Sequence, residues 1–274
     1  MKYRQRFGLK STPIPKDAKG KTFFEETPAY KRLERAFRRL TEEPGLGIVD
    51  AESGVGKTAA MRNLCGQLPK PDYLVVYICD TAVSPLDLYR TLAVELGVTP
   101  SHRRSLLWTD IKKSLLHLVD ERGTAPVVVV DEAQHLSDRF LLDLSGFLNF
   151  CFDSRDILTL WLVGLPGLRR TLAMQQHAAL ASRIVASIHL DPLGHELFDP
   201  FVRHALSVAG ATEKILGDQA LELLFRASRG IPRNASRILR TALILADERG
   251  QSFIDDSTME AAVDDLSLAL PDVA

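Results

Sequence analysis

The sequence predicts an α/β protein in which helices cover both faces of a parallel five-stranded sheet, followed by a small all-helical domain. Three observations carry this prediction. An apolar run, a small-residue turn and a helical pattern follow one another between Leu46 and Leu64. Apolar runs of strand length then alternate with helical patterns as far as Leu190, which is typical of parallel sheets because their strands are joined by crossover helices. After Leu193 the patterns are helical.

Size and composition are those of a globular protein with a well-buried core. The chain has 274 residues, 46% of them hydrophobic and 25% charged, and its formal net charge is −1. A charge so close to zero argues against a protein that coats nucleic acid by bulk charge. No apolar run has the length of a membrane span and no secretory leader follows Met1. We therefore expect a cytoplasmic protein without membrane contact.

The three cysteines have neither paired nor metal-ligand spacing. Reduced, mostly buried thiols are the expected state, in agreement with a cytoplasmic location. Charge is uneven along the chain, because the first 40 residues are mainly basic and those after Thr241 mainly acidic. Such ends either contact neighbouring subunits or are simply solvated, and both interpretations stay open.

The expected elements divide the chain into three segments. Residues 1–26 have no sustained period and are predicted to be a basic, extended N-terminal arm; residues 27–193 form the α/β domain and residues 194–274 a helical lid. The strands of the α/β domain are expected at the run starting at Leu46 and at Tyr73–Cys79, Val127–Val130, Ile157–Val163 and Ile184–Leu190. Its helices are expected at Pro28–Leu40, Lys57–Leu68, Pro85–Leu96, Thr109–Arg122, Asp138–Cys151 and Leu168–Met174. The lid helices are expected at Glu196–Val208, Asp218–Arg229, Asn234–Glu248 and Ser257–Leu266.

The turn ending in Gly56-Lys57-Thr58 has the composition of a phosphate-binding loop. Small residues let backbone N–H groups converge on phosphate oxygens, and the positive end of the following helix points at them. Lys57 is expected to reach the β- and γ-phosphates and Thr58 to offer its hydroxyl to Mg²⁺. The residues expected to bind nucleotide here are Ser53, Gly54, Val55, Gly56, Lys57, Thr58 and Ala59. Ala51 stands where the usual pattern begins with glycine, so we expect the turn to enter differently.

A second group of chemical residues is the acidic pair that ends VVVVDEAQHL, residues 127–136. A buried strand that delivers an acidic pair to its carboxyl end places Asp131 where it can hold Mg²⁺, together with Thr58. It places Glu132 where it can polarise an attacking water. The sequence therefore predicts an ATPase that uses ATP and Mg²⁺.

Five motifs in order, GVGKT, DEAQHL, LVGLPGLRR, LASRI and GIPRNASRIL, resemble those of AAA+ ATPases. Within that family they resemble the branch of ExeA-type ATPases and the TnsC, TniB and MuB transposition ATPases. The resemblance implies a three-layer P-loop domain with a helical lid. It also implies that Arg183 is an arginine finger reaching a neighbouring subunit's site, with Arg169 and Arg170 as rivals, and that Arg233 touches the γ-phosphate from the lid. The family usually has a polar sensor where this chain has Gly164 and Leu165.

The resemblance also implies a function, which we state as an expectation. An oligomer-dependent, DNA-stimulated ATPase would form a ring or filament on double-stranded DNA and recruit a transposase, with or without a target-selection adaptor. Its DNA contacts would be Arg103, Arg104, Lys112 and Lys113, although the same residues also fit a solvated helix face. The alternatives are an ExeA-type ATPase for secretion-system assembly, a replication initiator or loader, and a non-hydrolysing nucleotide switch.

Overall fold

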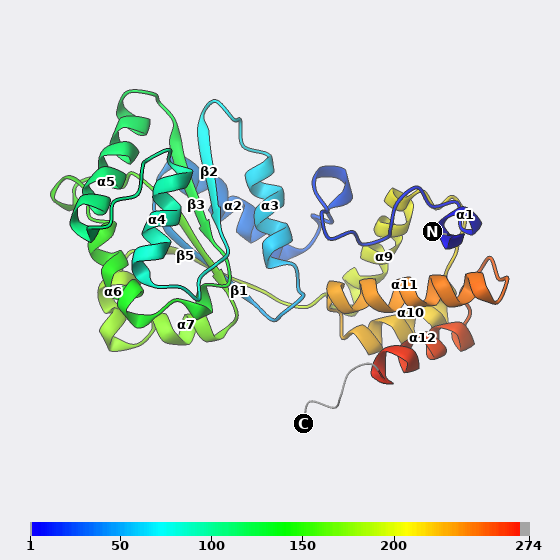
Figure 1. The fold of residues 1–274 in the computed structure, drawn as a ribbon. Helices are drawn as coiled ribbons and strands as arrows, with labels where there is room; N and C mark the ends of the chain where they lie inside the picture. The colour runs from blue at the N-terminus through cyan, green and yellow to red at the C-terminus, as the bar shows by residue number, and fades with distance from the viewer. Residues whose placement is uncertain (1, 269–274) are drawn as a thin grey trace. The chain divides into compact units, whose positions relative to one another are not determined.

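The computed structural model describes residues 2–268, which form two compact units (Figure 1). The sheet unit comprises residues 28–52 and 60–190. The helical unit comprises, within the described part, residues 2–27, 53–59 and 191–268. The described chain thus starts in the helical unit, returns to it at the predicted phosphate loop and returns again after the last strand.

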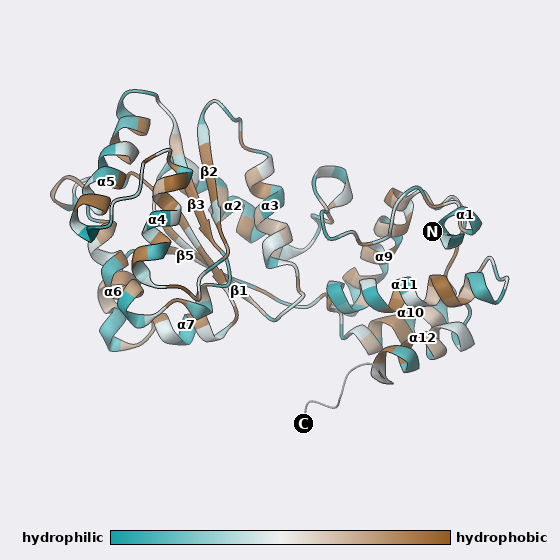
Figure 2. Cartoon of the chain, in the orientation of Figure 1, coloured by the Kyte–Doolittle hydropathy of each residue, from teal (hydrophilic) through white to brown (hydrophobic). Residues whose placement is uncertain are grey.

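The sheet has five strands in the order β2-β3-β4-β1-β5, and all its pairings are parallel. The strands are β1 (Leu46–Ala51), β2 (Tyr73–Ile78), β3 (Ala125–Val130), β4 (Thr159–Gly164) and β5 (Ile184–Leu190). Every residue of β1 and β4 is buried, because these inner strands are covered on both faces. Figure 2 shows the strands as largely hydrophobic. The predicted five-stranded parallel sheet is confirmed.

Helices pack on both sides of this sheet. They are α2 (Pro28–Glu42), α4 (Pro85–Glu95), α5 (Arg104–Asp120), α6 (Asp138–Phe147), α7 (Gly167–Leu172) and α8 (Ala178–Ala181), with short 3-10 helices at Ala133–His135 and Gln175–His177 and a turn of left-handed backbone at Cys151–Asp153. Helix α4 contacts β2 and helix α5 contacts β3, whereas α2 contacts both β1 and β5. Helix α3 (Lys57–Gly66) continues from the phosphate loop, so it begins in the helical unit and ends in the sheet unit.

Two helix boundaries differ by more than two residues from those predicted. Helix α5 begins at Arg104 rather than Thr109, because Leu107 belongs with Ile111 to its fully buried face. Helix α6 ends at Phe147 rather than Cys151. The backbone of Cys151, Phe152 and Asp153 has positive φ values of 50°, 60° and 62°, a conformation that a right-handed helix cannot contain.

The helical unit has its own apolar core. Its helices are α1 (Lys2–Arg6), α9 (His195–Ala209), α10 (Asp218–Ser228), α11 (Pro232–Glu248) and α12 (Asp256–Leu268), with a 3-10 helix at Gly20–Thr22. The four predicted lid helices are present as α9 to α12. The first residues of the chain belong to the same core, because Tyr3, Phe7 and Leu9 are buried in it.

The N-terminal segment therefore differs from the extended arm that the sequence predicts. It contains α1, and the Nε atom of Arg6 donates to a carboxylate oxygen of Asp247 in α11 over 2.7 Å. Tyr3, Phe7 and Leu9 are too few to form a sustained period, yet tertiary packing buries all three. The basic start and the acidic end of the chain thus meet, at this pair, within one molecule.

The cysteines are less buried than expected. Cys79 and Cys151 are exposed, and Cys65 is half-buried. Burial of the Cys65 thiol raises its pKa to about 12, so this thiol stays protonated at neutral pH. Within residues 2–268, each helix is too short or too polar to cross a bilayer.

A substitution of Gly47 tests the packing of β1 against β4. A Cβ atom at this position would lie 2.5 Å from the ring of Trp161, which is fully buried and stacked on Phe37. We expect Gly47→Ala to lower the free energy of unfolding by about 1–3 kcal/mol, because a packed core cannot make room for the methyl group. Denaturant unfolding measures the loss. The control is Gly66→Ala, since nothing lies within 4 Å of a Cβ there; an equal loss in both variants would contradict the packing described.

Candidate active site

The predicted phosphate loop follows the carboxyl end of β1. Ala51 is the last, fully buried residue of that strand and pairs in register with Leu190 of β5. The backbone has positive φ further on, at Gly54 (86°) and Gly56 (116°). Glycine is therefore needed at these two positions and not at Ala51, which is extended. This explains how the loop tolerates alanine at the start of the motif.

Helix α3 begins directly after the loop, at Lys57. The first N–H groups of a helix have no partner within it, and the helix dipole is positive at this end. The backbone of Lys57, Thr58 and Ala59 therefore offers donors suited to a phosphate. The Lys57 side chain is buried, with 7% of the residue exposed. These residues continue the turn formed by Ser53, Gly54, Val55 and Gly56.

The start of α11 lies against this loop, within the helical unit. The backbone N–H of Arg233 donates to the carbonyl of Gly54 over 3.2 Å, and its Nη1 donates to the Ser53 hydroxyl over 3.0 Å. A Cβ at position 54 would lie 2.8 Å from the Arg233 Cβ, so the approach requires glycine. The exposed Arg233 guanidinium is thus held beside the turn that is expected to bind phosphate.

The acidic pair follows β3, as predicted. Asp131 is buried; its Oδ2 accepts a hydrogen bond from the Tyr77 hydroxyl over 2.9 Å and its Oδ1 accepts one from the Glu132 N–H over 2.8 Å. Burial and the neighbouring Asp131 carboxylate raise the pKa of Tyr77, which therefore remains a proton donor at neutral pH. Glu132, in contrast, is exposed.

The backbone of Glu132 is held in an uncommon conformation. Its φ is +51°, and its carbonyl accepts a hydrogen bond from the buried Thr81 hydroxyl over 2.8 Å. A left-handed non-glycine residue costs of order 1–3 kcal/mol, and such residues cluster at functional sites. The Glu132 carboxylate is also bound, because Nε2 of Gln134 donates to its Oε2 over 2.7 Å. Sequence reasoning did not single out Thr81, Tyr77 or Gln134.

Asp131 and Thr58 carry the oxygen ligands that Mg²⁺ prefers. Among residues 2–268 there is no group of three or more His, Cys, Asp or Glu side chains that could hold a metal ion by itself. Mg²⁺ commonly binds through one or two protein ligands together with substrate phosphates. The residues present therefore fit Mg²⁺ that arrives with a nucleotide.

The phosphate loop and the acidic pair begin at the same edge of the sheet. Strands β1 and β3 are parallel and separated by β4, so their carboxyl ends lie at one edge. In open α/β sheets ligands bind beyond the carboxyl ends of the strands. The strands that precede the two predicted groups of residues thus end at one edge of the sheet.

Arg183 lies between α8 and the edge strand β5. Its Nη2 is 2.6 Å from Oδ1 of Asp153, and its side chain is 24% exposed. Both residues line a hollow of about 460 Å³, with Ser145 and Ala179. Because the Asp153 side chain is half exposed, this ion pair contributes little and is easily exchanged for another carboxylate or phosphate.

The rival Arg169 has a different environment. Its Nη2 lies 2.5 Å from Oδ1 of Asp50, a buried residue at the end of β1, and His189 Nδ1 lies 2.6 Å from the other oxygen. Removing Arg169 would leave a buried carboxylate with one partner fewer. The structure therefore gives Arg169 a role within the sheet unit, and Arg170 stays a rival of Arg183.

Two of the four residues predicted to bind DNA make contacts within the chain. Arg104 pairs with Asp143 over 2.7 Å and lies over the ring of Trp108 at 4.3 Å. The Lys112 ammonium donates to the Asn149 carbonyl over 2.7 Å, and desolvation lowers its pKa. The other two, Arg103 and Lys113, are exposed.

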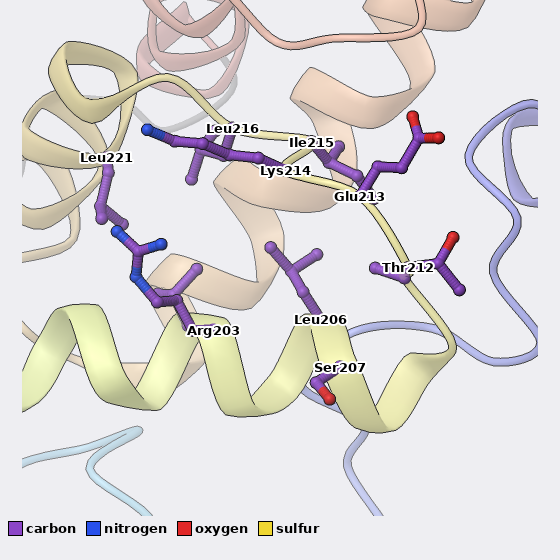
Figure 3. A pocket seen from close by; sticks show the side chains of 11 residues that line it. Arg203, Leu206, Ser207, Thr212, Glu213, Lys214, Ile215, Leu216 and Leu221 are labelled. Carbon is purple, nitrogen blue, oxygen red and sulfur yellow. The ribbon is translucent and has the colours of Figure 1, made fainter.

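A separate pocket of about 260 Å³ lies in the helical unit (Figure 3). It is formed by α9 and the segment that follows it, and Leu206, Ile215 and Leu216 provide its apolar lining. Arg203 and Lys214 also line it. Its lining includes no residue that the sequence singled out for nucleotide or DNA.

A family model described as an AAA domain matches residues 39–172. Residues 39–172 are an AAA domain. The AAA domain runs from the end of α2 to the end of α7, and it contains the phosphate loop and the acidic pair. It does not include Arg183, Arg233 or the lid helices.

The curated proteins that are similar to the chain include a secretion protein and a phage protein. General secretion pathway protein A of Aeromonas hydrophila is 33% identical over 267 residues, which is 97% of this chain and 48% of that protein. ATP-dependent target DNA activator B of Escherichia phage Mu is 28% identical over 121 residues, 44% of this chain and 36% of that protein. The chain thus spans about half the length of the first and less of the second.

Among solved structures, the ORC2 protein of Aeropyrum pernix in ADPNP–ADP complexes superimposes with a TM-score of 0.69. The match covers 98% of this chain and 72% of that one at 15% identity, so it shows the fold alone. The chain has this fold, with a parallel five-stranded sheet and a helical C-terminal region. The predicted fold class is confirmed.

Proposed function

We propose that the chain hydrolyses ATP to ADP and phosphate. The supporting observation is that the phosphate loop and the acidic pair follow two parallel strands of one sheet, β1 and β3, whose carboxyl ends share an edge. In this proposal the loop N–H groups and Lys57 bind the phosphates, and Asp131 and Thr58 bind Mg²⁺. The metal ion, when bound with ATP, neutralises charge on the phosphates.

Glu132 is the proposed general base. Its exposed carboxylate accepts a proton from the attacking water while the water adds to the γ-phosphorus and the bond to the bridging oxygen of ADP breaks. Arg233, held beside Ser53 and Gly54, provides a positive charge from the lid. The bonds of Glu132 with Gln134 and of Arg233 with Ser53 support these roles.

The proposed active unit is a homo-oligomer. Arg183 belongs to the sheet unit near the edge strand β5, and its guanidinium is paired with the half-exposed carboxylate of Asp153. A neighbouring copy can therefore receive this guanidinium at little cost in lost ion pairing. Each site would then hold its nucleotide with one chain and complete its catalytic residues with the next.

For the cellular role, the comparisons favour a secretion-pathway ATPase over the transposition regulator that the sequence first suggested. The similarity to the secretion protein extends over 97% of the chain, whereas the similarity to the phage DNA activator extends over 44%. Two of the four expected DNA contacts, Arg104 and Lys112, are also engaged within the chain. We therefore propose an ATPase that acts in assembly or operation of a secretion system.

The second candidate is an ATP-dependent regulator of DNA transposition, with double-stranded DNA, a transposase and a target-selection adaptor as partners. The 28% identity to the phage activator and the exposed Arg103 and Lys113 support it. The fold likeness to ORC2 does not support a replication loader, since 15% identity shows the fold alone.

Phosphate release with and without duplex DNA separates the two candidates. The secretion proposal predicts the same rate in both at low salt, where contacts to phosphates are strongest. Stimulation by duplex DNA, lost in the Arg103→Ala/Lys113→Ala variant and unchanged in Arg122→Ala, would instead support the DNA regulator. Heparin serves as the polyanion control, because a rate increase with heparin as well would indicate charge alone.

A further inference from the structure

We propose that Gln134 is a positioning residue that fixes the Glu132 carboxylate for hydrolysis by connecting it to the carboxyl end of β4. The inference rests on the proposed ATPase function. It assigns a role to a side chain in the segment after β3 that the chemistry described above does not use. All the contacts that carry it lie within the sheet unit.

The Gln134 amide bridges two parts of the chain with both of its polar ends. Its Oε1 accepts a hydrogen bond from the backbone N–H of Leu165 over 3.0 Å, and its Nε2 donates to Oε2 of Glu132 over 2.7 Å. The orientation of the amide follows from chemistry, because an N–H requires an acceptor and a carboxylate requires a donor. Neither glutamate nor an apolar residue can make both bonds at neutral pH.

The neighbouring Gly164 makes room for this bridge. A Cβ at position 164 would lie 2.8 Å from the Gln134 Oε1 and 3.2 Å from its backbone nitrogen. Gly164 is the last residue of β4, buried, and without a positive φ. Its lack of a side chain is therefore explained by the space that Gln134 occupies. The last residue of β4, Gly164, has no side chain, and the polar side chain of Gln134, from the segment after β3, lies there instead.

The consequence for Glu132 is an ordered carboxylate. An exposed glutamate would otherwise sample several rotamers, and ordering it during the reaction would cost entropy. The bond to Gln134 engages Oε2 and leaves Oε1 for the water, while the Thr81 hydroxyl and the left-handed backbone fix the residue from the other end. A misplacement of about 1 Å in such a group can cost about 10²-fold in rate.

The test compares kcat for ATP with the Kd of a non-hydrolysable ATP analogue. We expect Gln134→Ala to lower kcat by about 10²-fold and to leave the Kd and the unfolding midpoint unchanged. The control is His135→Ala, which removes the exposed neighbouring side chain and should keep kcat. Because Gly164→Ala displaces the same amide, it should lower kcat in the wild type but have little further effect in Gln134→Ala.

Gln134→Glu adds a readout that a purely structural role would not change. At neutral pH its carboxylate cannot donate to Glu132, so kcat should be as low as in Gln134→Ala. As the pH falls towards 5, the introduced carboxyl takes up a proton, which it then shares with the adjacent Glu132. The kcat ratio of Gln134→Glu to Gln134→Ala should therefore rise as the pH falls.

Three results would overturn the inference. The first is a kcat of Gln134→Ala within about twofold of the wild type, and the second is a loss of kcat that only follows a loss of ATP affinity or stability. The third is additive effects of Gly164→Ala and Gln134→Ala, since independent residues add. A wild-type chain that binds ATP but releases no phosphate would instead refute the proposed function itself, so the two failures can be told apart.

Discussion

Arg183→Ala is expected to lower kcat for ATP by ~10³–10⁵-fold, the size of effect that an arginine finger produces. The guanidinium is paired with the half-exposed Asp153, and losing such an exposed ion pair costs little stability, so its removal should not unfold the chain. ATP binding should persist, because the proposed nucleotide contacts of one chain do not include its own Arg183. Phosphate release and the Kd of a fluorescent ATP analogue measure the two quantities separately.

The control for this variant is Arg170→Ala, which removes an exposed arginine of α7 in the same unit. We expect it to keep wild-type kcat. If Arg170→Ala abolished turnover and Arg183→Ala did not, the finger would be Arg170. If both variants hydrolysed ATP at the wild-type rate, the idea of a finger in this part of the chain would be wrong.

Glu132→Gln is expected to lower kcat by ~10²–10⁴-fold, the usual contribution of a general base. The amide has the size of the carboxylate but cannot accept the proton from water. ATP should therefore bind and remain intact, and the assembled oligomer should persist. Single-turnover phosphate release together with size-exclusion chromatography in ATP·Mg²⁺ measures both. Glu95→Gln, at the exposed end of α4, is the matched control; unchanged turnover in Glu132→Gln would remove this residue from the mechanism.

Mixing the two inactive variants tests whether sites are shared between chains. Arg183→Ala retains a complete phosphate loop and Glu132, whereas Glu132→Gln retains the finger. At interfaces where Glu132→Gln supplies Arg183 to an Arg183→Ala neighbour, every proposed catalytic residue is present. We therefore expect activity in the mixture that neither variant shows alone. A mixture as inactive as its components would argue against a site completed by a second copy.

Much of the fold could be predicted because the responsible forces act locally in sequence. Buried parallel strands need continuous apolar runs, and β1, β3 and β4 have them. The lid helices were also predicted, because each one buries an apolar face whose residues recur at helical spacing. The N-terminal segment was mispredicted because Tyr3, Phe7 and Leu9 become buried only through contacts with helices more than 180 residues away in the chain.

The candidate site also has features that the sequence predicts and features that only the fold reveals. The phosphate loop and the acidic pair have fixed spacings, so they are visible in the sequence. The Gln134 bridge and the Asp50–Arg169–His189 group depend on which strand ends the topology brings together. The predicted DNA contacts rested on charge alone and not on a motif of fixed spacing. Charge could not show that Arg104 is bound by Asp143 or that Lys112 is bound by a backbone carbonyl.

The most direct single measurement is the rate of phosphate release per chain, in ATP·Mg²⁺, as the concentration of the purified protein is raised. We predict a rate per chain that is low when the protein is dilute and rises to a plateau as copies assemble, because each site needs the Arg183 of a neighbour. A rate per chain that is the same at every concentration would contradict the shared site, and no release at any concentration would contradict the ATPase itself.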